Sequence, residues 1–243
     1  GERVRREIAQ ASGNGDLAVV RCDVSDMGAV REAAAHVLAH EPALHVLVNN
    51  AGVLPTTRRE TPEGLELTFA TNVLGPFLLT NLLLGRLRES APARVITVSS
   101  GGMYTARLDP ADLQTEQREY DGPEVYARTK RAEVILTELW ADRLRGTGVV
   151  AHAMHPGWAR TAGVAESLPR FNRVMRPLLR TPEEGADTIV WLGAAEEPAE
   201  STGRFWHDRR PRPTHRVPWT KETREDRERL WAACAELSDW TED

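Results

Sequence analysis

Three short apolar runs limit what this chain can fold into. "LHVLV" (44–48), "RVITV" (94–98) and "GVVAHA" (148–153) are almost continuously apolar and rich in β-branched residues. Strands covered by helices on both faces have this composition, whereas strands with one solvated face alternate apolar and polar residues. Strands of this kind run parallel and need helical crossovers between them. The runs therefore predict an α/β fold with a parallel sheet at its centre.

Weaker patterns extend this picture. Strands are also expected at 17–22 and 203–206, and helices near 27–40, 63–88, 124–145 and 182–195. Thr61 and Thr181 each precede a Pro-Glu pair, which is typical of a capping residue followed by proline at the first helical position. The alternation of strands and helices predicts a doubly wound, mostly parallel, Rossmann-like sheet.

The C-terminal residues 208–243 are expected to pack as an extension on the domain of residues 1–207. They begin with a basic, proline-rich stretch, "DRRPRPTHRVP" (208–218), which we expect to be irregular. A final helix is expected at about 221–237. Its apolar face is predicted from three residues at helical spacing, Trp231, Cys234 and Leu237. We see no internal repeat and no linker that would divide the chain.

Composition narrows the classes of function. The 31 basic and 36 acidic residues give a net charge of −5, which argues against a dedicated nucleic-acid binder. Two cysteines, Cys22 and Cys234, cannot form a disulfide framework, so we expect a reducing, cytoplasmic location. No apolar run approaches the ~18 residues that span a bilayer, and we expect no membrane span. We also expect no metal site, because no cluster of ligands surrounds His155.

Polar residues follow the predicted strands at their carboxyl ends, where open α/β sheets bind ligands. Asn49-Asn50-Ala51-Gly52, Ser99-Ser100-Gly101-Gly102 and His155-Pro156-Gly157 each stand at such an end, and each alone could be a simple turn. Asn72 lies inside a helical pattern, although asparagine is a poor helix former. It therefore indicates either a polar task or a local kink.

Tyr126 and Lys130 lie four residues apart in a predicted helix, so they share one face. A free phenol ionises near pH ~10, and a cation one turn away favours its ionised form. Such a pair can move a proton near neutral pH. A single pair of this kind also arises by chance in many surface helices. The polar strand ends are what favour the catalytic interpretation here.

Together, these motifs resemble those of the short-chain dehydrogenase/reductase family. Five motifs match the family in order and in spacing: "NNAG" (49–52), "TN" (71–72), "SS" (99–100), "YARTK" (126–130) and "HPG" (155–157). The likeness covers about residues 1–207. The stretch "HPGWARTAGV" followed by "RTPEEGADTIVWL" is similar to the retinol-dehydrogenase-like branch. This resemblance implies an NAD(P)-dependent oxidoreductase that interconverts an alcohol and a carbonyl by hydride transfer.

The resemblance also implies roles for single residues. Tyr126 would be the acid/base, Ser100 would polarise the carbonyl, and Asn72 would hold a water that passes protons to Lys130. Tyr126 and Lys130 would also contact the cofactor, with the lysine on the nicotinamide ribose. The remaining cofactor contacts would be Asp23 and Val24 at the adenine, Asn49, Ala51 and Gly52 behind the cofactor, and Pro156, Gly157 and Thr161 at the nicotinamide end. The branch slightly favours NADP over NAD.

Asp23 has a second interpretation. The stretch "DVSD" (23–26) could equally begin the next helix, with Ser25 or Asp26 as its cap. The two interpretations are compatible, because a loop can flank a nucleotide and lead into a capped helix.

The sequence departs from the family in one respect. It contains no T-G-x-x-x-G-x-G loop, which in the family binds the pyrophosphate at a helix N-terminus. The chain also has no initiator Met, so we expect it to be N-terminally truncated and to lack the first βαβ portion. The parent protein is then expected to be an enzyme and this stretch alone to be inactive. The alternatives are a non-catalytic binding protein of the same fold and an inactive gene fragment.

The substrate is expected to contact residues 162–180. That stretch has no acidic residue after Glu166, which favours an apolar or anionic small molecule over a cationic one, and we expect a lipophilic carbonyl or alcohol. Its apolar residues recur at helical intervals, at Leu168, Phe171, Val174, Met175, Leu178 and Leu179. They predict a short, broken helical lid, with an ordinary surface helix as the alternative. The interspersed arginines leave a peripheral membrane contact open, and self-association is also left open.

Overall fold

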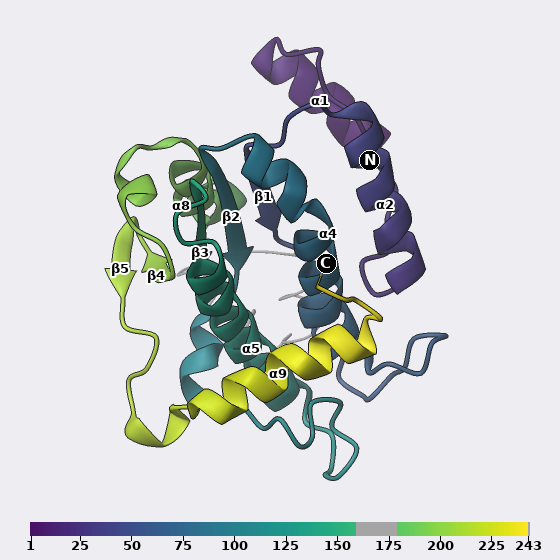
Figure 1. Cartoon of the computed structure of the whole chain (residues 1–243), viewed down its shortest axis with the longest axis vertical. Helices are drawn as coiled ribbons and strands as arrows, with labels where there is room; N and C mark the ends of the chain where they lie inside the picture. Colours follow the sequence, from purple (N-terminus) through teal and green to yellow (C-terminus); the bar gives the residue numbers. More distant parts are fainter. Residues whose placement is uncertain (159–178, 243) are drawn as a thin grey trace.

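The computed structural model describes residues 1–158 and 179–242, and in these ranges a five-stranded sheet forms the centre of the molecule (Figure 1). The strands lie in the order β1 (Val46–Asn49), β2 (Ala93–Val98), β3 (Val149–Met154), β4 (Arg204–His207) and β5 (Arg210–Arg212). The first four are parallel, and β5 pairs antiparallel with β4. The predicted α/β fold with a mostly parallel sheet is confirmed.

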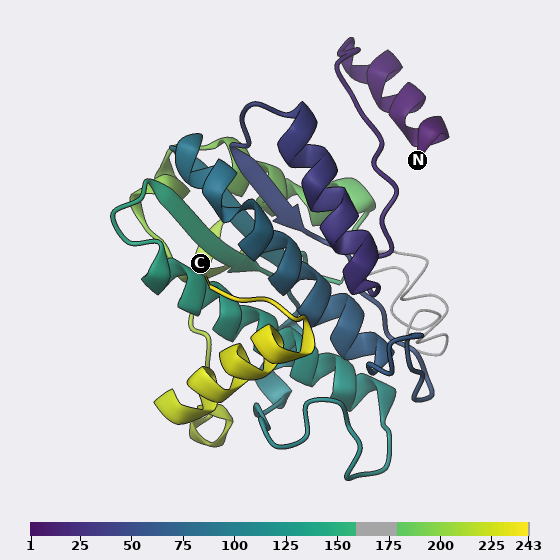
Figure 2. The same cartoon turned by 45° about the vertical axis from the view of Figure 1, so that its right-hand side comes forward.

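Helices connect these strands. They are α1 (Glu2–Ser12), α2 (Met27–His40), α3 (Leu67–Phe69), the π-helix η1 (Ala70–Leu74), α4 (Gly75–Glu89), α5 (Gly122–Arg143), α8 (Pro182–Ala194) and α9 (Arg224–Leu237). Short 3-10 turns are η2 (Gly101–Thr105), η4 (Glu197–Glu200) and η5 (Pro218–Thr220). Figure 2 shows α1 apart from the rest of the molecule, and none of its residues is buried.

Both faces of the sheet are covered at its central strand, β2, whereas the edge strand β1 is only partly buried. On β2, Val95 belongs to the core formed with α2, α4, α5 and α9, whereas its neighbour Ile96 belongs to the core formed with α8. Both side chains are fully buried. Successive side chains of a strand point to opposite faces, so a strand between two helical layers has no solvated face.

The predicted final helix is confirmed as α9, which packs on the same core. Trp231 and Cys234 are buried, and the Trp231 ring meets Phe77 of α4 edge to face at 5.0 Å between centroids. Trp231 also packs against Trp140 of α5 at 6.4 Å. Residues from the end of the chain therefore complete the layer formed by α4 and α5.

Two expectations about strands are wrong. Residues 17–22 form no strand, and Val19 and Val20 are 38% and 39% exposed. A strand exists only through its hydrogen-bonded neighbour, and no described segment pairs with this one. The basic stretch after β4 is not wholly irregular. Asp208 and Arg209 both adopt positive φ, which forms the tight two-residue turn between β4 and β5.

The helix after β1 begins later than its sequence predicts. Its cap is Glu66, whose carboxylate accepts hydrogen bonds from the main-chain N–H groups of Thr68 and Phe69. Thr61 instead belongs to a turn that contains Gly64 at φ +81°. The predicted cap at Thr181 is confirmed, with a reciprocal bond between Thr181 and Glu184.

The stretch Leu67–Glu89 is long and apolar enough to cross a membrane, contrary to the expectation that no such run exists. Of its most apolar 18 residues, 78% are buried inside the fold. Its apolar side chains contact the sheet, α2, α5 and α9. The burial identifies it as a core helix of this domain.

Candidate active site

Three strand ends meet at one edge of the sheet and present the predicted motifs. The parallel registers pair Asn49 of β1 with Thr97 of β2, and Val98 of β2 with Met154 of β3. The main chain continues this order beyond the strands, because Ser99 N donates to Met154 O at 2.8 Å. The segments that begin at Asn49, Ser99 and His155 therefore lie side by side.

Lys130 extends from α5 into this edge. Its side chain is 3% exposed, and Nζ lies 5.4 Å from the centroid of the Tyr126 ring. The ammonium donates to Val98 O at 3.0 Å and to Glu133 Oε1 at 2.6 Å. An ammonium has three hydrogens, so these two bonds leave one donor for a ligand.

Asn72 lies in the π-helix η1, directly beside this lysine. Its amide group donates to Val53 O and Thr129 Oγ1, and its Oδ1 accepts from Val53 N. This π-helix agrees with the local kink that the sequence suggested at Asn72, because a single π-turn within an α-helix changes the direction in which a side chain points. Asn72 thus links the segment after β1 to α5.

Gly52 completes this group of residues. A Cβ atom placed on Gly52 would lie 3.4 Å from Lys130 Nζ and 3.5 Å from Asn72 Oδ1. Gly52 itself is exposed. The absent side chain therefore places the ammonium and the amide oxygen at contact distance from an exposed stretch of main chain.

The two serines after β2 have different surroundings. Ser99 Oγ donates to Lys130 O at 2.7 Å, so this hydroxyl fixes α5 against the sheet. Ser100 Oγ accepts from Gly102 N at 3.2 Å, which leaves its hydrogen to donate elsewhere. A Cβ atom on Gly102 would lie near both Ser100 Oγ and Ala127, the neighbour of Tyr126. Ser100 is therefore the serine whose hydroxyl hydrogen is not donated to the main chain.

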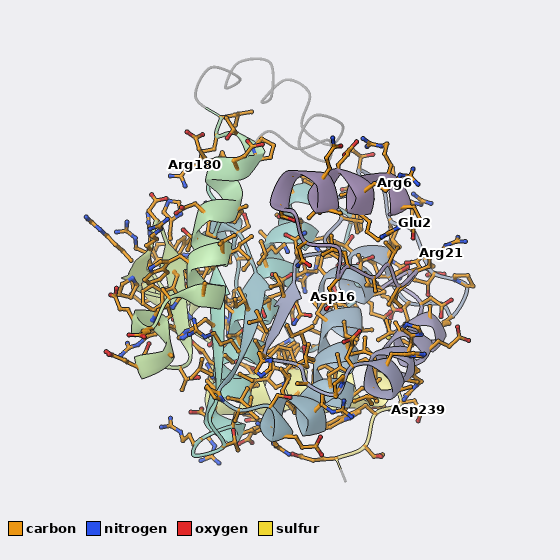
Figure 3. The ribbon with its side chains drawn as sticks, turned by 90° about the horizontal axis from the view of Figure 1, so that it is seen from above. Glu2, Arg6, Asp16, Arg21, Arg180 and Asp239 are labelled. Carbon is orange, nitrogen blue, oxygen red and sulfur yellow. The ribbon has the colours of Figure 1, made fainter. Side chains whose placement is uncertain are left out.

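The turn after β3 is held by Arg180, which the sequence did not suggest. Gly157 has φ +81°, and a Cβ atom there would lie 2.7 Å from Arg180 Nε. The guanidinium donates to Pro156 O at 3.3 Å and to both carboxylate oxygens of Asp208. Figure 3 shows Arg180 beside the start of α8, more than twenty residues along the chain from this turn. Only the folded chain reveals a pairing of this range.

His155 lies against the segment after β2. A Cβ atom on Gly101 would lie 3.0 Å from His155 Nε2, and the His155 ring stacks on His207 at 4.9 Å. Burial, followed by the charges of His207 and Arg180, lowers the pKa of His155 to about 4. The ring is therefore neutral at physiological pH, and the group behaves as a packed residue of the site wall.

The other predicted residues lie around this centre. Asp23 is exposed and accepts from Ser25, while Asp26 caps α2, as one of the two interpretations required. Val24 O lies so close to Gly75 that a Cβ there would overlap it. Asn49 donates to Thr80 within the core, so its side chain is structural.

Ala51 and Thr161 were also predicted as cofactor contacts. Ala51 is exposed, beside Gly52. Thr161 and the predicted lid, apart from its last residues, lie outside the described residues.

These residues fit the nicotinamide–ribose half of a dinucleotide. The exposed main chain at Gly52, the remaining donor of Lys130 and the available hydroxyl hydrogen of Ser100 all lie at the carboxyl edge of the sheet. Glycine at such a position lets a ligand approach the backbone closely. The sequence contains no glycine-rich loop for the pyrophosphate. The fit therefore concerns this half alone.

Comparisons with known proteins agree with this geometry. The family model described as short chain dehydrogenase matches residues 1–170. The human protein "Dehydrogenase/reductase SDR family member 12" is 41% identical over 215 residues, which are 88% of this chain and 67% of that protein. Bovine "Retinol dehydrogenase 12" is 38% identical over 239 residues, 98% of this chain and 74% of that protein.

Solved structures show the same fold. A crystal structure of a protein from Mycobacterium Paratuberculosis superposes with a TM-score of 0.73 at 27% identity, covering 97% of this chain and 80% of that chain. The chain therefore belongs to the short-chain dehydrogenase/reductase family, in its retinol-dehydrogenase-like branch, and is an NAD(P)-dependent oxidoreductase.

Proposed function

We propose that this chain interconverts a lipophilic alcohol and its carbonyl compound, with Tyr126 as the acid/base. The observation that carries the proposal is the buried Lys130 ammonium, 5.4 Å from the Tyr126 ring at the edge of the sheet where Ser100 and Asn72 also lie. A cation at this place can stabilise the negative charge that remains on the tyrosine oxygen once its proton has been transferred.

Each residue has one task in the reduction of a carbonyl. The nicotinamide ring supplies the hydride when it is bound. The Ser100 hydroxyl donates a hydrogen bond to the carbonyl oxygen, which increases the partial positive charge on the carbonyl carbon. Tyr126 gives its proton to the same oxygen, and Lys130 stabilises the phenolate that remains. In alcohol oxidation the same groups act in reverse.

In this proposal, Asn72 holds a water molecule beside the Lys130 ammonium. Both of its amide hydrogens are already donated, to Val53 and Thr129. The water that relays protons to Lys130 would therefore be held by an oxygen atom of Asn72. The rigid contacts of the side chain keep that oxygen beside the ammonium.

The substrate class and the cofactor preference come from the relatives. Relatives named retinol dehydrogenase 11, 12 and 14 support a lipophilic alcohol or aldehyde as substrate. The same branch supports NADP over NAD. A cytoplasmic location remains part of the proposal, because neither cysteine forms a disulfide.

Replacement of Tyr126 by phenylalanine in the full-length protein tests the proposal. We expect turnover of all-trans-retinal with NADPH to fall by roughly 10²–10⁴-fold, because general acid–base catalysis contributes about this much. The dissociation constant for NADPH, measured by fluorescence titration, should change little. Tyr104→Phe is the control, because its hydroxyl bonds Pro213 O and not the site. Wild-type turnover of Tyr126→Phe would overturn the proposal.

A further inference from the structure

The Lys130 ammonium lies in surroundings that do not by themselves sustain a charge. The side chain is 3% exposed, and burial alone lowers the pKa of a lysine because it removes water from the charged form. Of its two described hydrogen-bond partners, Val98 O is neutral and Glu133 Oε1 is the charged one. The proposed chemistry at Tyr126 needs this ammonium to stay ionised.

Glu133 lies three residues further along α5 and is as deeply buried as the lysine. Its side chain is 4% exposed, and Oε1 lies 2.6 Å from Lys130 Nζ. The second oxygen, Oε2, has no hydrogen-bond partner among the described residues. A buried carboxylate with one unsatisfied oxygen is costly, and an opposite charge at contact distance offsets that cost.

The two groups respond to each other. Burial raises the pKa of Glu133 to about 7, against the lowering effects of Lys130 and, to a smaller extent, of the Ser99 hydroxyl. For Lys130, burial lowers the pKa, but Glu133 and then Tyr126 outweigh it, so the pKa of the lysine is raised overall. The lysine therefore keeps its proton because a carboxylate is beside it.

Two other titratable side chains near α5 form hydrogen bonds with groups other than Lys130. Tyr104 of η2 donates to Pro213 O, and His152 of β3 bonds Pro198 O and the Trp206 indole. Within the part of the chain that the structure describes, the charges acting on Lys130 come from Glu133 and Tyr126. The charge on the lysine thus depends on this one carboxylate.

We propose that Glu133 is a positioning residue of this enzyme, the buried counter-ion that keeps Lys130 charged and holds its ammonium beside Val98 O and the Tyr126 ring. This inference rests on the proposed function of Tyr126 and Lys130, and it adds a residue that none of the matched motifs contains. Glu133 touches neither substrate nor cofactor in this proposal. It acts through the lysine.

Glu133→Gln in the full-length protein removes the charge and keeps the shape of the side chain. Burial would then act unopposed on Lys130, so the lysine should lose its proton at a lower pH. We measure kcat/KM for all-trans-retinal against pH. We expect its alkaline decrease to occur at a pH about one unit or more below that of the parent. We expect NADPH affinity, measured by tryptophan fluorescence without turnover, to weaken over the same lower pH range.

Two variants complete the experiment. Glu133→Asp keeps the carboxylate and should restore the parent profile at least in part. Glu138→Gln removes a carboxylate from the same helix, where it bonds Arg227, and should leave both profiles unchanged. A Glu133→Gln profile that overlays the parent, or an aspartate variant that behaves like the glutamine variant, would overturn the inference.

Folding and function can be separated. If Glu133→Gln does not fold, the double variant Glu133→Leu/Lys130→Met decides, because it leaves no unpaired charge in the core. A folded double variant supports the counter-ion, and an unfolded one shows that the carboxylate is needed for structure instead. If Tyr126→Phe kept full turnover, the proposed function would fail, whereas the NADPH-binding profile would still report on Glu133.

Discussion

His155 shows how a single residue acquires properties that its sequence position does not reveal. The motif places it before a turn, and the sequence supports no ligand role for it. In the fold, His155 lies against Gly101 and His207, and its buried Nδ1 has no hydrogen-bond partner among residues 1–158 and 179–242. Burial depends on segments that are distant in the chain, so no local pattern could have predicted it.

This burial predicts an acid-sensitive fold. The pKa of His155 is lowered from 6.5 to about 4, so the unfolded chain binds its proton first as the pH falls. The free energy of unfolding should therefore decrease between pH 6.5 and pH 4, by at most about 3 kcal/mol from this residue. Urea denaturation at several pH values measures this.

The controls for this prediction use two substitutions. His155→Gln should remove most of the acid-side decrease, because glutamine does not titrate. His36→Gln changes an exposed histidine and should leave the decrease in place. Identical pH dependence for His155→Gln and the parent would show that His155 contributes nothing to it.

At the scale of secondary-structure elements, the sequence correctly predicted the strands whose composition alone determines their structure. The three apolar runs became β1, β2 and β3; β2 and β3 are buried on both faces, whereas β1 at the edge is only partly buried, with Val48 38% exposed. The prediction failed where a neighbour decides: residues 17–22 resemble a strand in composition but have no described partner. Thr61 resembled a cap, yet Glu66 reaches two N–H groups at the actual start of the helix. Local rules allow several starts, and packing selects one.

Asn72 and Asn81 allow a matched experiment on one helical stretch. Asn72→Ala removes bonds to Val53 and Thr129, and Asn81→Ala removes bonds to Phe77 O and the Trp140 indole. We expect both variants to lose about 1–3 kcal/mol of stability, because buried groups lose their partners. Thermal melts measure this loss.

Activity should distinguish the two variants. Only Asn72→Ala should reduce kcat in the protein that remains folded, because only Asn72 connects the Gly52 segment to Lys130. Equal kcat values for the two variants, measured well below their melting temperatures, would contradict a special role for the π-helix.

At the scale of the whole molecule, the proposed catalytic half of the site is better defined than the half that would bind the pyrophosphate. The sequence motifs predicted the residues at the sheet edge, and the structure brings Gly52, Asn72 and Lys130 together there. The pyrophosphate half has no equivalent in the sequence, which contains no glycine-rich loop. In the described part of the chain, β1 is paired on one side only, with β2.

This difference between the two halves of the site predicts how tightly the polypeptide of residues 1–243 binds NADPH and reduced nicotinamide mononucleotide. Because the residues fit only the nicotinamide–ribose half, reduced nicotinamide mononucleotide should bind about as weakly as NADPH. Fluorescence titration of the purified polypeptide with each compound compares them, and Lys130→Met should weaken both. Much tighter binding of NADPH would reveal a pyrophosphate site that these residues do not show.

The contact between Trp158 and Arg180 has a consequence for how such a chain can diversify. Arg180 N donates to Trp158 O, and the arginine side chain is bonded to Pro156 and Asp208. One arginine thus joins the turn after β3, the start of α8 and the turn between β4 and β5, which lie far apart in the sequence. Because each partner depends on the other for this contact, substitutions at Arg180 and Asp208 are expected to occur together in related chains rather than singly.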